Sequence, residues 1–409
     1  MRSPVCYSQA VNPIPYCLNI HPGETLGAVR DAITRHALAV KARVAPGGPY
    51  PLGLRLAAAA ADELTADPAA LEAFKETLTT HDLFVTGING FPYGAFHQTA
   101  VKTAVYQPDW TTPERLGYTS RLAAILAELL PEGQTGNLST VPLGYNWRRT
   151  EDGGRRTEEE ERRTTMFVRQ IAVMAEFLHL LHREKGREIV LALEPEPDCL
   201  LETTDEAIAW FEDELLHEGV RWLSRNGRRT RDEAEALLRN YVGLCLDTCH
   251  FAVAFEEPLT ALIRFESACI RVARIQVSAA VRTSVSEASL QRLAAFIDPV
   301  YLHQTKIRLP RGQIVSLPDL TAETLARARD FAGCELRTHF HVPLFYEGDA
   351  VLGSTHTDLT PGFFEHARRG QYPLEIETYT FDVLPAEIRP SDVVESLVRE
   401  HAWLQARVG

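Results

Sequence analysis

The chain has 409 residues, of which 45% are hydrophobic and 24% are charged, the balance of an ordinary folded protein rather than a disordered one. Its 25 glycines and 24 prolines are scattered, which excludes collagen-like and coiled-coil chains. The formal charge of −13 disfavours general nucleic-acid binding, because an acidic surface repels phosphate backbones.

The seven cysteines point to a reducing compartment. Their number is odd and no two form a Cys-x-x-Cys pair, and a chain of this length does not need disulfides to stabilise its core. Pro4, Pro13 and Pro15 interrupt the apolar run that a signal peptide needs. No stretch approaches the ~18 apolar residues of a membrane span. We therefore expect a cytoplasmic protein that is not an integral membrane protein.

Short apolar runs alternate with longer amphipathic segments. Eight runs have the length of a buried parallel strand: Tyr16–Ile20, Leu52–Leu56, Leu83–Ile88, Leu138–Leu143, Ile189–Leu193, Val242–Leu246, Val272–Val277 and Leu374–Thr378. This alternation predicts an α/β fold, a single (β/α)8 TIM barrel, rather than an open doubly wound sheet. The glycine-rich and Walker phosphate-binding patterns are absent, which removes the main nucleotide-binding alternatives.

The helical segments carry recognisable start signals. Thr112–Glu114 places proline at the first position of a predicted helix. A second helix is predicted over Met166–Leu181, and Asp392 with Glu395 predicts a capping box before the final helix.

Three segments depart from the simple repeat. Thr150–Thr165 is predicted to be a charged loop that leads into a solvated helix start, and Ser224–Asn240 combines a glycine turn with an exposed helix. An excursion over 279–370, between the seventh and eighth predicted strands, contains the extra apolar segment Leu336–Phe345. We expect one domain over residues 1–409.

Polar side chains end several predicted strands, where barrel enzymes place their active sites. Glu194 and Asp247 each follow an apolar run, His250 comes three residues after Asp247, and the last run carries Glu375 and Glu377. Glu375 and Glu377 share a parity, and the end-of-strand position favours Glu377 as the site residue.

Two further segments add polar groups. The seventh predicted strand carries Gln276, and His339 and His341 alternate across Phe340 in the excursion. Unpaired buried carboxylates are costly, so a convergent set of acids and imidazoles points to a metal. Such ligands suit Mn²⁺, Mg²⁺, Zn²⁺ or Fe²⁺ rather than a thiolate site, and Cys249 is expected to be a buried small hydrophobe.

Each residue also has a structural alternative. Asp247 can merely cap the following helix, and His250 can be a satisfied interior histidine. Glu194 can be a solvent-facing loop acid, and the two excursion histidines can lie on a surface strand. The joint pattern is stronger than any one of its parts.

Glu-Pro after the fifth predicted strand, Asp-x-x-His after the sixth and Glu after the eighth resemble the xylose isomerase-like TIM-barrel superfamily. That superfamily includes sugar isomerases and epimerases, inosose dehydratases and endonuclease IV-type DNA repair enzymes. Longer stretches resemble the metabolite traffic family EboE of bacterial ebo gene clusters. They are PYCLNIHPGET (15–25), NGFPYGAFH (89–97), QPDWTTPERLGYT (107–119) and LEIETYTFDVLP (374–385).

The superfamily resemblance implies a ligand set for a divalent metal ion (Mn, Mg or Zn). It assigns as ligands Glu194, Asp247, His250, His339, His341 and Glu377. The endonuclease-type members use an acidic-x-His pair where this chain has His339-Phe340-His341. A ligand histidine is usual in the seventh strand, where this chain has Gln276.

The resemblance also implies a reaction on a polyhydroxylated, sugar-like small molecule. Glu194 and Glu377 would act as acid and base on opposite sides of the substrate, with a metal-stabilised enediolate. The residues expected to bind substrate hydroxyls or a phosphate are His21, Arg55, Asn89, Tyr93 and Gln276. His21 also precedes a predicted helix start, which favours anions.

Two other functions stay open. A metal-dependent phosphodiesterase of the endonuclease IV type predicts a basic groove; the net charge weighs against it, and the Arg-rich segments 148–163 and 224–231 favour it. A non-catalytic protein that binds and hands over a metabolite is favoured by the altered seventh strand. The EboE resemblance implies a role in secondary metabolism, with proteins of the same gene cluster as partners.

Overall fold

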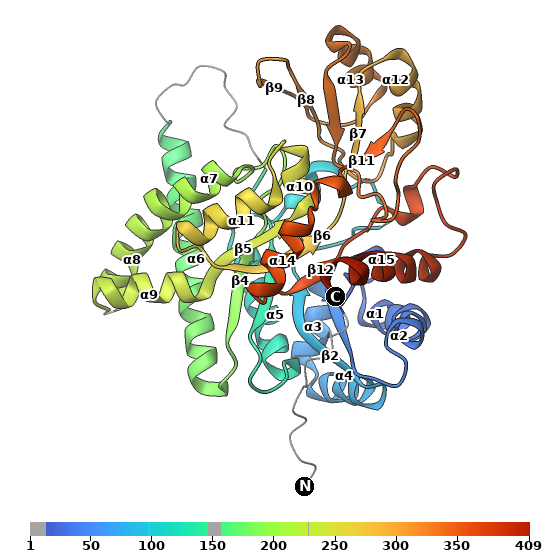
Figure 1. Ribbon diagram of the computed structural model, residues 1–409. Coiled ribbons are helices and arrows are strands. Elements are labelled where there is room, and N and C mark those ends of the chain that lie inside the picture. Colours follow the sequence, from blue (N-terminus) through green and yellow to red (C-terminus); the bar gives the residue numbers. More distant parts are fainter. Residues whose placement is uncertain (1–13, 98, 146–156, 228) are drawn as a thin grey trace.

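A computed structural model of the chain describes residues 14–97, 99–145, 157–227 and 229–409 (Figure 1). The main sheet has the strand order β1-β2-β3-β4-β5-β6-β12, and all neighbours are parallel. The strands are β1 Tyr50–Arg55, β2 Leu83–Asn89, β3 Gly136–Thr140, β4 Ile189–Leu193, β5 Val242–Asp247, β6 Val272–Val277 and β12 Leu374–Ile376. They correspond to the second to eighth predicted runs.

The first predicted strand, Tyr16–Ile20, is wrong as an extended strand. Tyr16 makes an isolated parallel bridge to Ile376 and Cys17 makes one to Gly53, after which Leu18–Ile20 forms the 3-10 helix η1. Pro15 has no N–H to donate to a longer ladder. The two bridges lie between the edge strands β12 and β1, so the sheet is a nearly closed parallel barrel. The predicted α/β barrel is confirmed, with a shortened first segment.

Helices surround the barrel (Figure 1). They are α1 Leu26–Ala32, α2 Leu38–Val44, α3 Ala58–Ala66, α4 Pro68–Thr80, α5 Pro113–Leu129, α6 Glu158–Lys185, α7 Thr204–Ala209, α8 Val220–Asn226, α9 Arg231–Tyr241, α10 Thr248–Val253, α11 Pro258–Ser267, α14 Pro361–Arg369 and α15 Val393–Val408. Turns of π-helix, η2 Ile33–Ala37 and η4 Trp210–Gly219, join α1 to α2 and α7 to α8. Every residue of β1, β3, β4, β5 and β6 is buried, as expected for parallel strands covered on both faces.

The helix starts agree with most of the capping patterns. The Thr112 side chain accepts from the backbone of Arg115 at the start of α5. Asp392 caps α15, but no capping box forms there, because Glu395 pairs with Arg43 at 2.8 Å instead.

The charged segments are partly described. Thr157 and Glu160 form a capping box at the start of α6, so this helix begins at Glu158, within the predicted charged segment and before Met166; residues 150–156 lie outside the described ranges. The segment Ser224–Asn240 comprises the end of α8, Gly227 and most of α9.

The excursion forms a second, antiparallel sheet with the order β11-β7-β10-β8-β9, at the top of Figure 1. Its strands are β7 Val281–Ser284, β8 Thr305–Arg308, β9 Ile314–Leu317, β10 Glu335–Thr338 and β11 Gly353–Ser354, accompanied by helices α12 Glu287–Leu293 and α13 Ala322–Ala328. Only the start of the predicted apolar segment Leu336–Phe345 is a strand. Its remainder is irregular chain that returns to the barrel, where the Val342 N–H donates to Ala279 O at 2.9 Å. That the whole chain forms one domain stays a prediction.

No helix among the described residues is long and apolar enough to cross a membrane. Six of the seven cysteines lie in the described ranges, and all six are free thiols. Cys6 lies outside those ranges.

Replacing Asp392 with Ala should destabilise the protein by about 1 kcal/mol, because the N–H groups of the first turn of α15 lose their side-chain acceptor. Glu395→Ala is the matched control, and it should cost less than about 0.5 kcal/mol, since its ion pair is exposed. Urea unfolding of the three proteins measures both values. Equal losses would contradict this account of the cap.

Candidate metal centre

The carboxyl ends of four strands bring four of the predicted site residues together. Glu194 follows β4, Asp247 ends β5, Gln276 lies in β6 and Glu377 follows β12, and all four are buried. Oxygen atoms of Glu194, Asp247 and Glu377 lie within 4.8 Å of one another. These three acids form what we name the carboxylate pocket.

The carboxylate pocket holds more negative charge than its neighbours can balance. The Gln276 amide nitrogen lies 3.2 Å from Glu194 Oε1 and 3.2 Å from Asp247 Oδ2, and it also contacts Glu377 Oε2. One amide has only two N–H donors and no charge. Burial, together with repulsion from neighbouring acids, holds the pKa of Glu194 and of Glu377 well above the usual range. Such a pocket requires either protons or a cation.

Three histidines form the adjoining imidazole pocket. His250 lies in α10, and His339 and His341 follow β10. The Nε2 atoms of His250 and His339 are 3.1 Å apart, and those of His339 and His341 are 3.1 Å apart. Ligand atoms of Asp247, His250 and His341 also lie within 4.8 Å of one another, so the two pockets are continuous.

The second nitrogen of each ring faces a carbonyl oxygen. His250 Nδ1 lies 2.9 Å from Pro195 O, and His341 Nδ1 lies 3.0 Å from Glu377 O. His339 Nδ1 lies 2.8 Å from the side-chain oxygen of Gln304, whose amide nitrogen donates to Pro197 O. Because a carbonyl oxygen only accepts, each Nδ1 carries the proton.

The Nε2 lone pair of His339 therefore faces those of His250 and His341 without a proton between them. Burial lowers the pKa of His250 to about 3 and that of His341 to about 4, and it also lowers the pKa of His339. The rings are thus neutral near pH 7, which is the form that binds metals. Converging lone pairs whose outer nitrogens are held by carbonyl groups are the usual arrangement around a metal ion.

The donor set fits a divalent ion. Imidazole nitrogens with carboxylate oxygens suit Zn²⁺, Mn²⁺ or Fe²⁺. In addition, Glu194 Oε2 and Glu196 Oε2 are buried and have no hydrogen-bond partner among the described residues. A buried carboxylate oxygen without a donor is costly, and a cation satisfies it.

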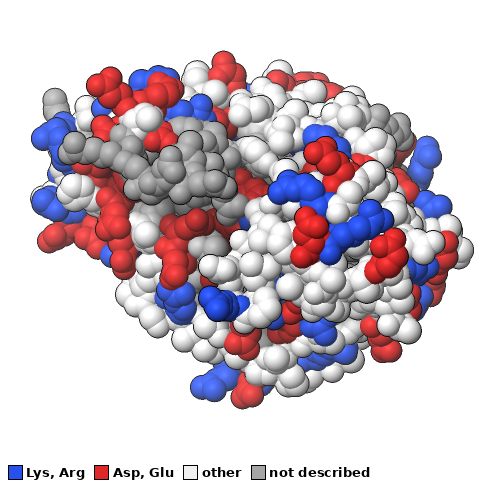
Figure 2. All heavy atoms as spheres, turned by 90° about the horizontal axis from the view of Figure 1, so that it is seen from above, with Lys and Arg blue, Asp and Glu red and all other residues white. Residues whose placement is uncertain are grey.

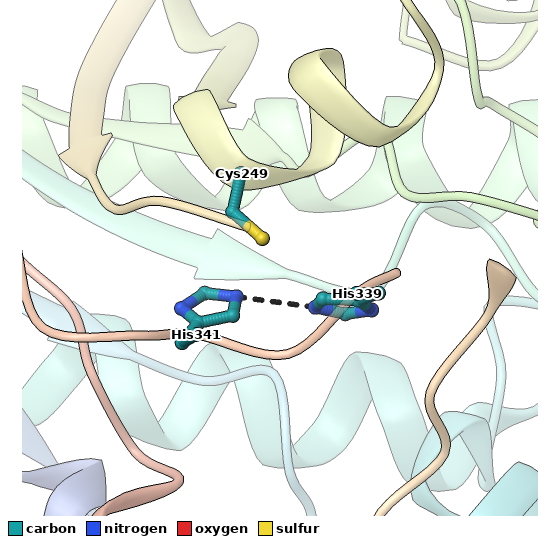
Figure 3. Close-up of side chains that lie close together, drawn as sticks. All are labelled: Cys249, His339 and His341. Carbon is teal, nitrogen blue, oxygen red and sulfur yellow. Dashed lines mark hydrogen bonds between the residues drawn. The ribbon is translucent and has the colours of Figure 1, made fainter. Parts of the chain in front are cut away.

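Asp247 both caps a helix and faces the site. Its Oδ1 accepts from the backbone nitrogens of Cys249 and His250 at the start of α10, while Oδ2 faces Gln276. The Cys249 thiol points toward His339 and His341 (Figure 3). It packs with Val253 and Ala280, and burial raises its pKa well above the usual value, so it is a neutral buried thiol, as expected from the sequence.

The other predicted substrate-binding residues lie in different places. Asn89 is at the site and donates to Glu377 Oε1 at 3.2 Å. His21 instead hydrogen-bonds Tyr16 and stacks on His36 at 4.3 Å. The cavity that opens above the two pockets is not lined by His21, Arg55 or Tyr93.

Arg55 and Tyr93 have packing roles. The Arg55 guanidinium pairs with Glu24 at 3.3 Å and donates to Gly94 O at 2.8 Å. The Tyr93 ring packs edge-on against Tyr118, with centroids 5.0 Å apart. The structure thus brings Asn89 and Gln276 to the site and leaves His21, Arg55 and Tyr93 outside it.

Sequence reasoning missed three polar residues at the site. Asn19 donates to Glu377 Oε1 at 2.6 Å, and it was hidden because its segment was predicted to be a strand. Glu196 accepts from Tyr106 at 2.7 Å, and its spacing of two from Glu194 was the available signal. Gln304 comes from the excursion, and nothing local in the sequence marks it.

Glu375 has a different partner from Glu377. Its carboxylate lies 3.4 Å from the buried guanidinium of Arg274 in the barrel interior. Arg274 also donates to Asn137 at 2.6 Å. This ion pair belongs to the core, so Glu377 is the acid of this strand that lies at the site.

A cavity opens over both pockets. Its polar lining consists of Asn19, Asn89, Glu194, Glu196, His250, His339 and Glu377. The rest of its lining is apolar or aromatic: Phe91, Pro92, Phe96, Val101, Val105, Tyr106, Tyr301, Leu302 and Tyr379.

Glu400 in α15 supports two segments that carry candidate ligands. Its Oε2 accepts from the Thr378 hydroxyl at 2.6 Å and from the Leu344 N–H at 3.1 Å. Thr378 follows Glu377, and Leu344 comes three residues after His341. Burial raises the pKa of Glu400 to about 7.

No family model and no curated protein sequence matches the chain. Solved structures with a similar fold include the probable 3-DHS dehydratase AsbF from Bacillus anthracis, which is 13% identical, with 96% of this chain and 98% of that chain covered and a TM-score of 0.45. A xylose isomerase domain protein from Planctomyces limnophilus is 12% identical, with 98% and 97% covered and a TM-score of 0.48.

A family 2 AP endonuclease from Brucella melitensis is 14% identical over 66% of this chain and 80% of that chain, with a TM-score of 0.36. Likenesses this weak carry no argument about activity. The resemblance to the EboE family rests on the sequence motifs alone.

Replacing His339 with Ala, or Glu194 with Gln, should reduce the metal bound by the purified protein, because each change removes a ligand from one pocket. We expect at least one equivalent of divalent metal in the parent protein after loading with Zn²⁺ or Mn²⁺ and desalting, measured by inductively coupled plasma mass spectrometry. His36→Ala, a half-buried histidine outside the pockets, is the control. Full metal content in both site variants would contradict the assignment.

Glu400→Gln should flatten the pH dependence of stability in the metal-free protein. A carboxyl whose pKa rises from 4.5 to about 7 on folding stabilises the protein fully below pH 4.5, and this stabilisation is lost as the pH rises through 7. Between pH 5 and 7 the parent should therefore lose up to about 1.4 kcal/mol per pH unit relative to the variant. Urea unfolding at three pH values measures this difference; parallel curves would contradict it.

Proposed function

We propose that this chain is a divalent-metal-dependent enzyme that transfers protons at carbon atoms of a small polyhydroxylated molecule, as an isomerase, an epimerase or a related lyase. The observation that carries the proposal is the convergence of three neutral imidazoles and three carboxylates, all buried, beneath one cavity at the carboxyl ends of the barrel strands. In barrel enzymes this end carries the chemistry.

Six residues would hold the metal: Glu194, Asp247, His250, His339, His341 and Glu377. A divalent ion bound there polarises substrate oxygens and neutralises the acids around it. The Nδ1–H groups of the three rings keep their carbonyl partners, so the ligand nitrogens stay aimed at the pocket.

Glu194 and Glu377 are the proposed acid and base. Glu194 lines the cavity, and its Oε2 has no hydrogen-bond donor among the described residues, so a proton taken from a carbon next to a carbonyl, like a cation, would satisfy this oxygen. Glu377 is oriented by Asn19 and Asn89 at Oε1. Both carboxyls have raised pKa values because they are buried, which makes each a stronger base once it is ionised.

Asn19 and Asn89 have a supporting role in this scheme. They donate to the same oxygen of Glu377 at 2.6 and 3.2 Å, which fixes the rotation of the carboxyl group. A base held in one orientation loses less entropy on reaching the reacting geometry.

Metal-dependent phosphodiester hydrolysis is the second candidate. The observation that favours it is the presence of two adjoining ligand groups, since two neighbouring ions can hold the attacking and leaving oxygens. Against it, acidic and basic side chains are mixed over the described part of the face seen in Figure 2, which is the end that carries the excursion. Hydrolysis of bis(p-nitrophenyl) phosphate by the zinc-loaded protein would favour this candidate over the first.

A third candidate is a non-catalytic binder that hands a metabolite to other proteins of its gene cluster. Gln276 in place of a ligand histidine supports it, as does the EboE-like sequence. This reading agrees with the same cavity and the same metal, and it differs from the first in predicting binding without turnover.

Glu377→Gln should abolish proton transfer while leaving the fold intact. The assay follows deuterium incorporation by NMR when a panel of sugars and cyclitols is incubated with the metal-loaded protein in D₂O. Loss of a general base lowers such rates by about 10²–10⁴-fold. Glu287→Gln, which alters an exposed carboxylate outside the cavity, is the control and should keep the parent's rate. An exchange rate in Glu377→Gln equal to the parent's would rule out its role as acid or base.

A further inference from the structure

The cavity over the carboxylate and imidazole pockets has a polar part and an apolar part. Its polar groups belong to residues at the barrel end that carries the two pockets. Its apolar side chains come from the chain after β2, from the excursion and from the segment after β12. A ligand in this cavity therefore meets donors and acceptors at one part of its surface and hydrocarbon at the rest.

Three aromatic rings form the first wall, which consists of Phe96, Tyr301 and Tyr379. Their centroids lie 5.1 Å apart for Phe96 and Tyr301, 5.3 Å for Phe96 and Tyr379, and 5.1 Å for Tyr301 and Tyr379. The Tyr301 hydroxyl is bound to His97 Nδ1 at 2.8 Å, and His97 Nε2 donates to Asn19 O at 2.7 Å. The first wall is thereby tied to the residue that orients Glu377.

Phe91 and Tyr106 form the second wall, with centroids 5.8 Å apart. The Tyr106 hydroxyl donates to Glu196 at 2.7 Å, and its ring stacks on Tyr145 at 5.1 Å. The hydroxyls of Tyr106 and Tyr301 already have partners within the protein. What these tyrosines offer to a ligand is their ring surface.

The two walls discriminate between classes of ligand. A hydroxyl group placed against Phe91, Phe96, Val101 or Leu302 loses its water and finds no partner on those side chains, which is costly. A planar apolar ring in the same position gains from burial and from ring–ring contact. An open-chain sugar with hydroxyls along its whole length is therefore a poor match for the apolar lining.

We infer that the substrate is amphipathic: two neighbouring oxygens at one end face the carboxylates and imidazoles, and an apolar or aromatic ring lies against the aromatic walls. This inference rests on the proposed function: among hydroxylated small molecules, it selects those that also carry an apolar or aromatic ring. The two oxygens would bind at the carboxylates and imidazoles, and the contacts of the ring with the aromatic walls would distinguish one substrate from another.

Two hydroxamates test the inference directly. Benzohydroxamate and acetohydroxamate present the same pair of adjacent oxygens and differ in a phenyl ring against a methyl group. Isothermal titration of the zinc-loaded protein should give at least about tenfold tighter binding of benzohydroxamate. Equal affinities would overturn the inference. The same titrations with the metal-free protein measure the preference for the phenyl ring without a contribution from the metal.

Three variants test which side chains cause the tighter binding of benzohydroxamate. Phe96→Ala should bring the ratio of the two affinities close to one, and Leu302→Ala should lower it, which also covers the case in which Phe96→Ala does not fold. Tyr93→Ala removes an aromatic ring that lies outside the cavity and should leave the ratio unchanged. A ratio that survives both cavity variants, or one that falls in Tyr93→Ala alone, would overturn the inference.

The outcomes also separate this inference from the proposed function. Zinc uptake without a ring preference would leave the metal centre standing and overturn the substrate class. Absence of zinc uptake would count against the proposed function, and the ring preference of the metal-free protein would then decide the inference by itself.

Discussion

The close approach of unprotonated imidazole nitrogens, with His339 Nε2 lying 3.1 Å from Nε2 of both His250 and His341, is the constraint on which the site depends. His250, His339 and His341 each donate Nδ1–H to a carbonyl oxygen, so the Nε2 atoms that face one another carry lone pairs. Neutral rings in this arrangement repel one another unless a cation lies between them. The adjoining carboxylates of Glu194, Asp247 and Glu377 lie within 4.8 Å of one another and repel when ionised. A cation shared by the two pockets would reduce both repulsions.

The excursion between β6 and β12 contributes residues to this candidate centre. It supplies two of the three rings, and it supplies Gln304, whose amide oxygen orients His339. It also contributes Tyr301 to the first aromatic wall. The barrel provides the acids at its strand ends, while the excursion completes the candidate metal site and contributes to the lining of the cavity above it. Glu400, in the last helix, accepts hydrogen bonds from Leu344 of the excursion and from Thr378 after β12, and so links the two parts.

Much of this architecture was predictable from local sequence. Seven parallel strands follow from the apolar runs. Glu194 and Asp247 could be predicted as candidate site residues because an acid at the end of such a run needs a partner or a function. Asn19 was missed because proline-limited bridging replaces the expected strand there with a 3-10 turn, which brings its side chain to Glu377. Gln304 depends on a long-range contact that no local pattern encodes. His21 was misplaced because a polar residue near a strand end can equally stack inside the protein, as it does on His36.

The most direct test of the central claim is X-ray absorption spectroscopy of the zinc-loaded protein. The account predicts a first shell of nitrogen and oxygen at about 2.0–2.2 Å, with the outer-shell scattering of imidazole rings, and no sulfur at about 2.3 Å. A zinc shell without imidazole scattering, or one dominated by sulfur from Cys249, would contradict the claim that the three histidines hold the metal.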